Sequence, residues 1–453
     1  MYQKNAEKLL DFIDRSPSCF HVIHNMKEEL EKAGFCQLRE NQAWTLEAGG
    51  AYYVTRNDSA IIAFRIPSSG QCTGYQIIAS HSDAPALKVK EHPEVDAEGS
   101  YVKLNVEKYG GMSVSTWLDR PLSAAGRILV NCSDKDADGH RKRFVLKQKL
   151  VNLDRDLLLI PNMAPHLNPE VNSGYKYNMK TDMMPVLGML PASGSDSAKP
   201  SLKALLAAEA EVDAQDIIAT DIFLYNRQKG TVWGAESEFI SSAKLDDLEC
   251  AYGSLMGILG ASGQSEKVAV HCVMDNEEVG SETRQGAAGT FLKDTLKRIC
   301  SCLGGNEEDY MRAVAESFLI SADNAHAVHP NRGDMADSVN RPKMNGGVVI
   351  KFSGNQKYAS DAVSAAVLQM LCEKAEVPVQ IYTNRSDLAG GSTLGNISTS
   401  QVSAATVDIG LPQLAMHSAY ETAGVKDISY LMELAKTFFD CSLQMEEGTW
   451  SLK

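Results

Sequence analysis

The chain has 453 residues, a length at which one hydrophobic core seldom suffices, so two domains or one domain with a large insertion are expected. Hydrophobic residues make up 44% and charged residues 23% of the sequence, which excludes a disordered or fibrous chain. The formal net charge is −14 and no dense Lys/Arg run occurs, which excludes nucleic acid as an expected partner.

The N-terminal segment and the cysteines bear on the cellular compartment. Residues 1–18 mix acidic and basic residues with apolar ones, unlike a secretory signal, and no later stretch of 18 apolar residues could span a membrane. Ten cysteines occur, and the closest pair, Cys300 and Cys302, lacks the spacing of common zinc motifs. We therefore expect a cytoplasmic protein with reduced, mostly buried thiols and no membrane partner.

The periodicity of apolar residues predicts the first elements of the chain. Residues 4–35 are expected to be helical, with a break at 15–18. Three short strands are expected to follow, at 51–57, 60–66 and 74–80. The third strand ends at the sequence "HSDAP", where polar residues begin.

A segment with a different sequence pattern, 92–230, interrupts this series of elements. It contains Gly-Gly and Asp-x-Asp turns and paired strand-like runs, then a predicted helix at 201–212 and a predicted strand at 216–226. Beyond it, strand and helix patterns alternate to the C-terminus, as in an open α/β sheet. We expect 1–91 and 231–453 to form that sheet domain, with the intervening segment inserted into it.

Several apolar runs end in polar residues that can bind a metal ion. These runs are "QIIASHSD", "KVAVHCVMDNEE", "AESFLISADNAH", "VPVQIYTNRSD" and "LAMHSAYE". In an open α/β sheet the binding site lies beyond the carboxyl ends of the strands. The pattern therefore predicts a site where these runs end.

Two adjacent glutamates, Glu277 and Glu278, end one of these runs. Neighbouring carboxylates repel each other, so a nearby dication would explain why both stay ionised. One of them can bind the metal while the other takes a proton from the attacking water. In "HSD", Asp83 can turn back to the ring nitrogen of His81 that does not bind metal, and so orient the ring.

Ten residues are candidates for this site. They are His81, Asp83, Asp246, Asp247, Glu277, Glu278, Asp323, His326, His329 and His417. Each one alone is more commonly a helix cap, a loop residue or a core residue. Together they supply carboxylates and imidazoles without thiolates, the donor set of catalytic zinc, manganese or cobalt.

Seven motifs carry a resemblance to a known family. In chain order they are "ASHSDAP", "KLDDLE", "DNEEVGSE", "SADNAHAVHPN", "VIKFSGNQKYASD", "GGSTLGNI" and "MHSAYE". Over nearly the whole chain they resemble the aspartyl aminopeptidase family of dinuclear zinc metallopeptidases. The resemblance implies an α/β fold: a mixed-sheet metallopeptidase domain with helices on both faces, interrupted by an inserted β-rich dimerisation domain. It also implies removal of one N-terminal residue from peptide substrates.

The resemblance further implies two divalent metal ions per subunit, Zn²⁺ or alternatively Mn²⁺ or Co²⁺. The implied ligands are His81, Asp246, Glu278, Asp323 and His417, with Asp246 bridging the two ions. Glu277 would then be the general base, and Asp83 would orient a ligand. Relatives often carry Asn where this chain has Asp247, which leaves open which aspartate bridges; we expect Asp246.

The resemblance also implies an assembly and a substrate class. The inserted domain resembles one that forms dimers within a larger, typically twelve-subunit particle, so a homododecamer is expected. His166 matches a histidine that reaches a neighbouring subunit's site. Lys351 matches a lysine that contacts an acidic substrate side chain, with Tyr358 alongside. Lys351 and Tyr358 therefore favour substrates with N-terminal Asp or Glu. Because some relatives prefer neutral N-terminal residues, a broader aminopeptidase is the alternative.

His326 and His329 could share one face if their turn is helical. We expect His326 near the substrate amine or around the metal ligands, and His329 in local hydrogen bonds.

Other functions fit the sequence less well. A serine hydrolase would need a G-x-S-x-G motif, and in "GGSTLG" the serine is one position off that pattern. No H-E-x-x-H zinc motif occurs. The alternative from another class is a catalytically inactive, particle-forming protein, and the complete set of ligands and base argues against it.

Overall fold

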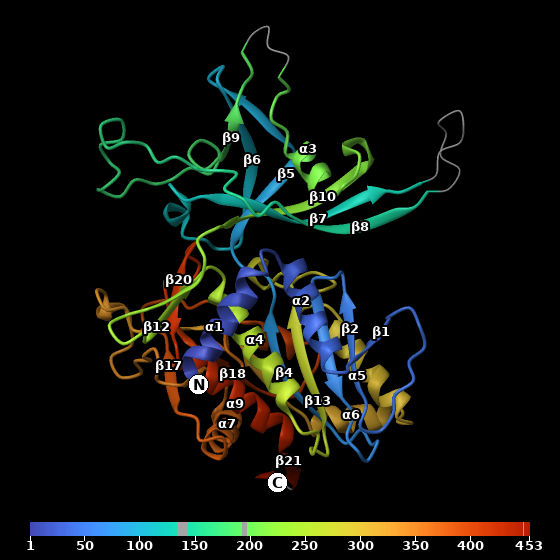
Figure 1. The fold of residues 1–453 in the computed structure, drawn as a ribbon. Helices are drawn as coiled ribbons and strands as arrows, with labels where there is room; N and C mark the ends of the chain where they lie inside the picture. The colour runs from blue at the N-terminus through green and yellow to red at the C-terminus, as the bar shows by residue number, and fades with distance from the viewer. Residues whose placement is uncertain (134–143, 193–196, 447) are drawn as a thin grey trace.

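The computed structural model describes residues 1–133, 144–192, 197–446 and 448–453. They form a lower body around a large sheet and an upper body around a smaller sheet (Figure 1). The two termini lie in the lower body, and the upper body is built from the middle of the chain.

The large sheet of the lower body has nine strands in the order β1-β2-β3-β13-β4-β14-β18-β16-β17. Their bounds are β1 Cys36–Leu38, β2 Ala51–Arg56, β3 Ala60–Arg65, β4 Tyr75–His81, β13 Val268–Met274, β14 Phe318–Ala322, β16 Val348–Phe352, β17 Val379–Thr383 and β18 Ala405–Gly410. In the centre of the sheet, β13, β4, β14 and β18 lie side by side and run parallel to one another. β3, beside β13, and β16, beside β18, run antiparallel to these four strands. The carboxyl ends of the four parallel strands therefore share one edge of a mixed sheet.

Helices cover both faces of this sheet. One face packs against α1 Tyr2–Asp14, α2 Cys19–Lys32, α4 Leu245–Gly260, α7 Ala362–Lys374 and α9 Asp427–Asp440. The other packs against α5 Phe291–Cys302, α6 Glu307–Ala315 and α8 Leu394–Ser398. Successive residues of a strand point to opposite faces, so Ile78 lies in the first core and Ile77 in the second. Both faces of β4 are therefore buried, which explains the apolar residues 77–79 at its centre.

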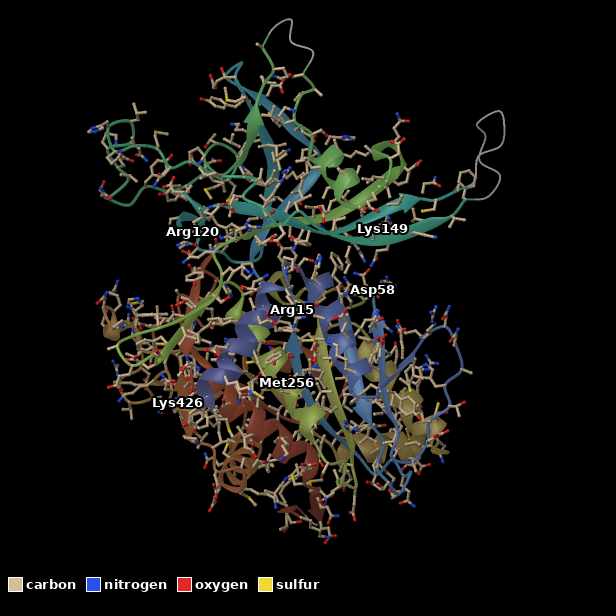
Figure 2. The ribbon with its side chains drawn as sticks, in the orientation of Figure 1. Arg15, Asp58, Arg120, Lys149, Met256 and Lys426 are labelled. Carbon is tan, nitrogen blue, oxygen red and sulfur yellow. The ribbon has the colours of Figure 1, made fainter. Side chains whose placement is uncertain are left out.

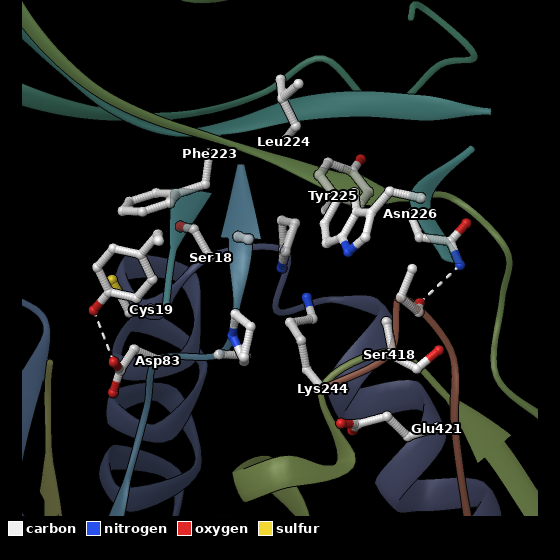
Figure 3. A pocket seen from close by; sticks show the side chains of 18 of the residues that line it. Ser18, Cys19, Asp83, Phe223, Leu224, Tyr225, Asn226, Lys244, Ser418 and Glu421 are labelled. Carbon is white, nitrogen blue, oxygen red and sulfur yellow. Dashed lines mark hydrogen bonds between the residues drawn. The ribbon is translucent and has the colours of Figure 1, made fainter. Parts of the chain in front are cut away.

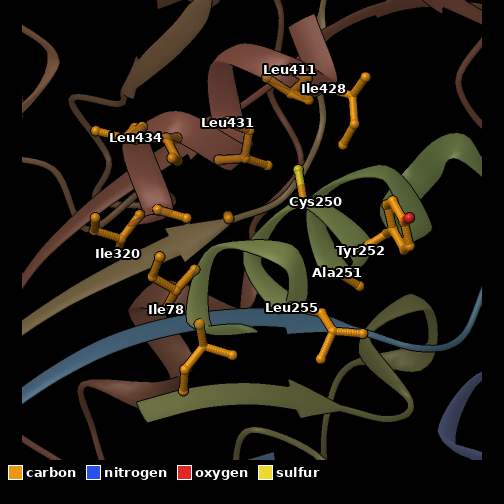
Figure 4. Packing of buried hydrophobic residues seen from close by; sticks show 14 of the residues in the cluster. Ile78, Cys250, Ala251, Tyr252, Leu255, Ile320, Leu411, Ile428, Leu431 and Leu434 are labelled. Atoms are coloured by element: carbon orange, nitrogen blue, oxygen red, sulfur yellow. The ribbon is translucent and has the colours of Figure 1, made fainter. Parts of the chain in front are cut away.

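The first core is built around the contact between α4 and α9, which Figure 4 shows with Leu255, Ile428 and Leu431 among the packed side chains. Gly257 permits this close approach. A Cβ built at that position would lie 2.4 Å from the Cβ of Ala435. Because α4 begins beside the predicted ligand Asp246, the same packing fixes that ligand.

The upper body is a six-stranded sheet in the order β8-β7-β10-β5-β6-β9. Its strands are β5 Ala86–Ala97, β6 Tyr101–Tyr109, β7 Leu122–Asn131, β8 Leu146–Asn152, β9 Val186–Met189 and β10 Ile217–Asn226, with helix α3 Leu202–Glu209. The predicted helix and final strand of the segment are confirmed. The sheet already begins upstream of residue 92, because β5 starts at Ala86, with four residues between it and the end of β4 in the lower body, and pairs with β6 and β10.

Two small sheets complete the structure. A five-stranded sheet has the order β11-β12-β20-β19-β15, and β21 pairs with β22. The bounds are β11 Thr231–Trp233, β12 Phe239–Ser242, β15 Ala325–His326, β19 Pro412–Leu414, β20 Glu421–Gly424, β21 Leu443–Glu446 and β22 Thr449–Leu452. Within the described ranges, no helix is long and apolar enough to cross a membrane. The predicted fold class, a mixed α/β sheet domain with a separate antiparallel sheet, is confirmed.

Polar contacts join the two bodies away from the predicted site. Arg127 on β7 donates to the carbonyl of Asn57 at 2.9 Å, and its guanidinium lies 4.3 Å from the ring centroid of Phe20. Gln148 on β8 donates to Asp58 at 3.2 Å, and Figure 2 labels Asp58 at the top of the lower body. The upper sheet is thereby held above the carboxyl edge of the large sheet.

Candidate metal centre and active site

The shared carboxyl edge brings the predicted ligands together. His81 is the last residue of β4, Asp323 follows β14, and Glu277 and Glu278 lie in a short 3₁₀ turn after β13. Asp246 lies at the start of α4, and His417 lies between β19 and β20 with a left-handed backbone, φ +64°. Five segments that are distant in sequence therefore converge on one place.

Asp246 lies between two histidines. Its Oδ1 is 3.6 Å from Nε2 of His81, and its Oδ2 is 3.3 Å from Nε2 of His417. The same His417 nitrogen is 3.3 Å from Oε1 of Glu278. One carboxylate thus faces two separate donor groups through its two oxygens, which is the arrangement of a bridging ligand.

The donor atoms form overlapping groups. His81, Asp246, Asp247 and Asp323 make one; His81, Glu277 and Glu278 make a second; Asp246, Glu278 and His417 make a third. Within each group the ligand atoms lie within 4.8 Å of one another. The separation between ligand atoms around a tetrahedral zinc ion is about 3.3–3.6 Å, which matches the distances around Asp246.

Unsatisfied buried oxygens support a metal at this place. Oδ1 of Asp246 and Oε1 of Glu278 are buried and make no hydrogen bond to any described residue. An isolated buried carboxylate oxygen is costly unless a cation or donor meets it. The donor set, carboxylates and imidazoles without a thiolate, therefore fits divalent ions in a catalytic centre.

The electrostatics of the site point the same way. Burial, together with the neighbouring carboxylates, raises the pKa of Glu278 and raises that of Glu277 to about 8. Burial would also raise the pKa of Asp246, but the neighbouring His417 and His81 outweigh it and hold the pKa below its usual range. A dication supplies the positive charge that so many close carboxylates require.

Asp83 holds the two glutamates as well as the histidine ring. Its carboxylate accepts main-chain hydrogen bonds from Glu277 at 3.1 Å and Glu278 at 3.2 Å. Nδ1 of His81 lies 3.4 Å from the Asp83 carboxylate but only 3.1 Å from the Asp83 carbonyl oxygen. The carbonyl is thus the nearer acceptor for the ring, and the carboxylate positions the acidic turn.

Two positioning residues were not singled out from the sequence. Tyr109, at the end of β6, donates to the Asp83 carboxylate at 2.7 Å. Glu421 accepts from the main-chain N–H of His417 at 2.7 Å and from that of Asp246 at 3.0 Å. Glu421 ends the "MHSAYE" motif, which is a usable signal, whereas nothing in the sequence around Tyr109 marks it.

Asp247 is fully buried and differs from Asp246 in its contacts. Its Oδ2 accepts the main-chain N–H of His81 at 3.1 Å. Burial raises the pKa of its carboxyl group. It thus supports the backbone of one histidine ligand, whereas Asp246 faces both histidines.

A cavity of ≈ 280 Å³ opens beside the predicted ligands. Glu277 lines it together with Asp246 and Asp323, and no side-chain hydrogen bond of Glu277 is among the described contacts. Its carboxylate is therefore available to a molecule in the cavity.

Lys351 and Tyr358 line the same cavity. Lys351 is only 3% exposed, its Nζ donates to the carbonyl of Asn324 at 2.9 Å, and it lies 3.5 Å from Asp323. Its ammonium also lies 5.4 Å from the ring centroid of Tyr358. Burial alone would lower the pKa of Lys351, but Asp323 and other anionic neighbours raise it, so the group stays cationic.

The remaining predicted histidines are His166, which lies away from the cavity, and His326 and His329, which do not share a helical turn. His166 is in an exposed loop of the upper body and does not line the cavity beside Asp246. The helical turn considered for His326 and His329 is wrong, because His326 lies in strand β15. His329 makes the expected local contact: its Nδ1 accepts from the main-chain N–H of Asn331 at 3.2 Å.

A second cavity, ≈ 50 Å³, lies behind the site, between the two bodies (Figure 3). Asp83 and Glu421 lie on opposite sides of it, below Phe223 and Tyr225 from β10. The upper body therefore supplies aromatic side chains to the region that holds the two positioning carboxylates.

Comparisons with known proteins agree with this geometry. The family described as Aminopeptidase I zinc metalloprotease (M18) matches residues 12–439. A protein of Clostridium novyi (strain NT) described as "Probable M18 family aminopeptidase 2" is 44% identical over 439 residues, covering 96% of this chain and 99% of that protein. A protein of Ectopseudomonas mendocina (strain ymp) with the same description is 38% identical over 440 residues, covering 97% of this chain and 99% of that protein.

Solved structures show the same fold. The structure "Cryo-EM structure of the Ape4 and Nbr1 complex" matches with a TM-score of 0.90 at 35% identity, covering 97% of this chain and 86% of that one. "Structure of S. cerevesiae mApe1 dodecamer" matches with a TM-score of 0.82 at 27% identity, covering 97% of each chain. The chain therefore belongs to the M18 family of zinc metalloaminopeptidases, enzymes that hydrolyse peptide bonds.

Proposed function

We propose that the protein removes N-terminal Asp or Glu from peptides, with two divalent metal ions per subunit, most simply Zn²⁺. The observation that carries the two-ion assignment is Asp246, whose oxygens lie 3.6 Å from His81 and 3.3 Å from His417. Asp323 would complete the His81 site, and Glu278 the His417 site. The alternatives are a broader aminopeptidase of the same family and a catalytically inactive particle-forming protein.

The side chains of this chain have separable tasks in that reaction. When bound, the ions supply Lewis-acid polarisation of the scissile carbonyl and lower the pKa of the attacking water. Glu277 accepts a proton from that water and returns it to the departing amine. Asp83 fixes the turn that carries Glu277, through the main-chain hydrogen bond at 3.1 Å. Tyr109 in turn fixes Asp83.

The preference for an acidic first residue rests on Lys351. Its ammonium has one hydrogen bond, to Asn324, and lies in the cavity that Glu277 also lines. An ammonium has three donors; Asn324 accepts from one and Asp323 lies 3.5 Å away to meet another, so one remains for a substrate carboxylate. A neutral substrate side chain would leave this buried charge with fewer partners, which disfavours its binding.

Lys351→Met is expected to lower kcat/KM for an Asp-headed peptide by about 10–150-fold, the value of a hydrogen bond to a charged group. The same change should affect a Leu-headed peptide much less. The measurement is release of the free amino acid from matched Asp and Leu peptides by the zinc-loaded protein. Lys357→Met, at an exposed position nearby, is the matched control.

A different ranking of the two peptides would decide between the alternatives. If wild-type protein cuts the Leu peptide faster, the acidic preference is wrong and the broader aminopeptidase stands. If it cuts neither peptide, the inactive particle-forming protein is favoured.

We also propose a homododecamer built from dimers, with residues 92–230 as the dimerisation domain and His166 reaching a neighbouring subunit's site. The similarity to mApe1, whose structure is of a dodecamer, supports this. The exposure of His166 also supports it. Light scattering should give about twelve times the 49.2 kDa chain mass, and a monomer at micromolar concentration would contradict both the assembly and the role of His166.

A cytoplasmic location is part of the same proposal. All ten cysteines are free thiols, as expected in a reducing compartment. Fractionation of the producing cells tests it.

A further inference from the structure

A groove continues from the active-site cavity. A cavity of ≈ 320 Å³ adjoins the ≈ 280 Å³ cavity that holds Glu277, and the two share His326, Tyr382 and Gly391 in their walls. At Gly391 an added Cβ would meet nothing within 4 Å, so the backbone there borders open space. A molecule in the first cavity could therefore extend into the second.

The strand β15 gives this groove a free sheet edge. β15 is the terminal strand of the five-stranded sheet and pairs only with β19 among the described strands. The main-chain N–H of Ala325 donates to the carbonyl of Leu411, just before β19, and that of Ala327 donates to Gln413 of β19, at 2.8 Å each. Alternation along a strand then turns the N–H and C=O of His326 away from β19, toward the open edge. His326 is exposed and lines both cavities, so this pair of groups is accessible from the groove.

The charges of the groove cancel locally. Arg332 forms two hydrogen bonds with Asp334, both at 3.0 Å. Arg385 forms two with Asp387, at 2.6 and 2.8 Å. Each arginine already has a carboxylate partner, so the groove has little excess charge with which to select an acidic group.

The remaining wall is partly apolar. Met335 and Leu388 line the groove and are 40% and 39% exposed. Val328 and Leu414 also line it. Exposed apolar side chains in a concave wall favour contact with an uncharged side chain of a bound molecule.

We propose that this groove binds the part of the peptide that follows the scissile bond, in extended form, paired with the main chain of His326. An extended peptide can add to a free strand edge through main-chain hydrogen bonds, while alternate side chains occupy neighbouring pockets. The residues after the first are thus recognised by their backbone and by apolar contact with Met335 and Leu388. This inference rests on the proposed aminopeptidase function and specifies its substrate: peptides of three or more residues, in preference to dipeptides.

The first test compares Asp-Leu, Asp-Leu-Ala and Asp-Leu-Ala-Ala with the zinc-loaded protein. Two main-chain hydrogen bonds predict a rise in kcat/KM of about tenfold from the dipeptide to the tetrapeptide. Ala336→Trp places a large ring in the groove wall and should reduce the tetrapeptide-to-dipeptide ratio to about one. Val339→Trp adds the same ring three residues away, at a position 80% exposed and outside the groove lining, and should keep the wild-type ratio.

Two outcomes would contradict the proposal that the groove binds the peptide beyond the scissile bond. One is a wild-type enzyme with equal kcat/KM for all three peptides. The other is an Ala336→Trp enzyme that loses the same factor on dipeptide and tetrapeptide, which would place the ring in the pocket for the first residue.

A binding measurement separates this inference from the proposed function. Fluorescence anisotropy of labelled N-acetyl-Leu-Ala-Ala-Ala, which offers no free N-terminus, should show weaker binding to Ala336→Trp than to Val339→Trp. If binding is weakened in this way but wild-type protein cleaves no Asp-headed peptide, the proposed function is contradicted and the proposal of peptide binding in the groove stands. Equal binding to both variants would contradict peptide binding in the groove, whatever the peptidase activity.

Discussion

Glu277→Gln is expected to lower kcat for an Asp-headed peptide by about 10²–10⁴-fold, the usual contribution of a positioned general base. Glutamine has nearly the same shape but cannot accept the proton of the attacking water. The main-chain hydrogen bond from residue 277 to Asp83 does not depend on the side chain and should persist. The metal content, measured by elemental analysis after removal of unbound ions, should therefore stay at the wild-type value.

The neighbouring glutamate supplies the contrast. Glu278 lies 3.3 Å from the His417 nitrogen, in the Asp246–Glu278–His417 group, so Glu278→Ala should lose both activity and metal. Glu282→Gln, at an exposed position, is the control for changes of surface charge. Equal loss of metal from Glu277→Gln and Glu278→Ala would show that both glutamates are ligands and would remove Glu277 as the base.

The location of the site could be predicted because strand ends are marked in the sequence. The runs that end at His81 and before Asp323 are mostly apolar, without a polar residue at every second position, as expected for strands buried on both faces. Parallel strands meet at one edge, so residues at their carboxyl ends are brought together whatever their separation in sequence. This argument needs no knowledge of side-chain positions.

The supporting contacts could not be predicted in this way. Tyr109 belongs to the upper sheet and reaches Asp83 because the end of β6 pairs with the start of β5, where Tyr109 lies opposite Ala86. Asn324 is buried between Glu249 and Gln413 and also accepts from Lys351 through its carbonyl. Such contacts depend on tertiary packing between distant segments, for which local periodicity carries no signal.

The structure of the segment after Asp323 also escaped local patterns. A spacing of three between His326 and His329 suits a helical turn, but β15 is held by pairing with β19. A two-residue strand is too short to show alternation in the sequence. Its partner lies more than eighty residues away, so only the fold reveals the free edge at His326.

Asp246→Asn is expected to have an effect at least as large as that of Glu277→Gln. An amide offers one oxygen and one N–H₂ group, so it cannot place an acceptor toward both His81 and His417. The protein should lose metal, and activity should fall by about 10³-fold or more, because the ions provide several kcal/mol of transition-state stabilisation. Metal content and kcat/KM for an Asp-headed peptide measure the two effects together.

Asp247→Asn is the matched comparison, since it makes the same chemical change one residue away. The asparagine oxygen can still accept the His81 main-chain N–H that Asp247 now accepts at 3.1 Å. Burial already favours the neutral form of Asp247, so a neutral amide should cost little there. We therefore expect Asp247→Asn to retain more metal and more activity than Asp246→Asn. The reverse order would assign the bridging role to Asp247.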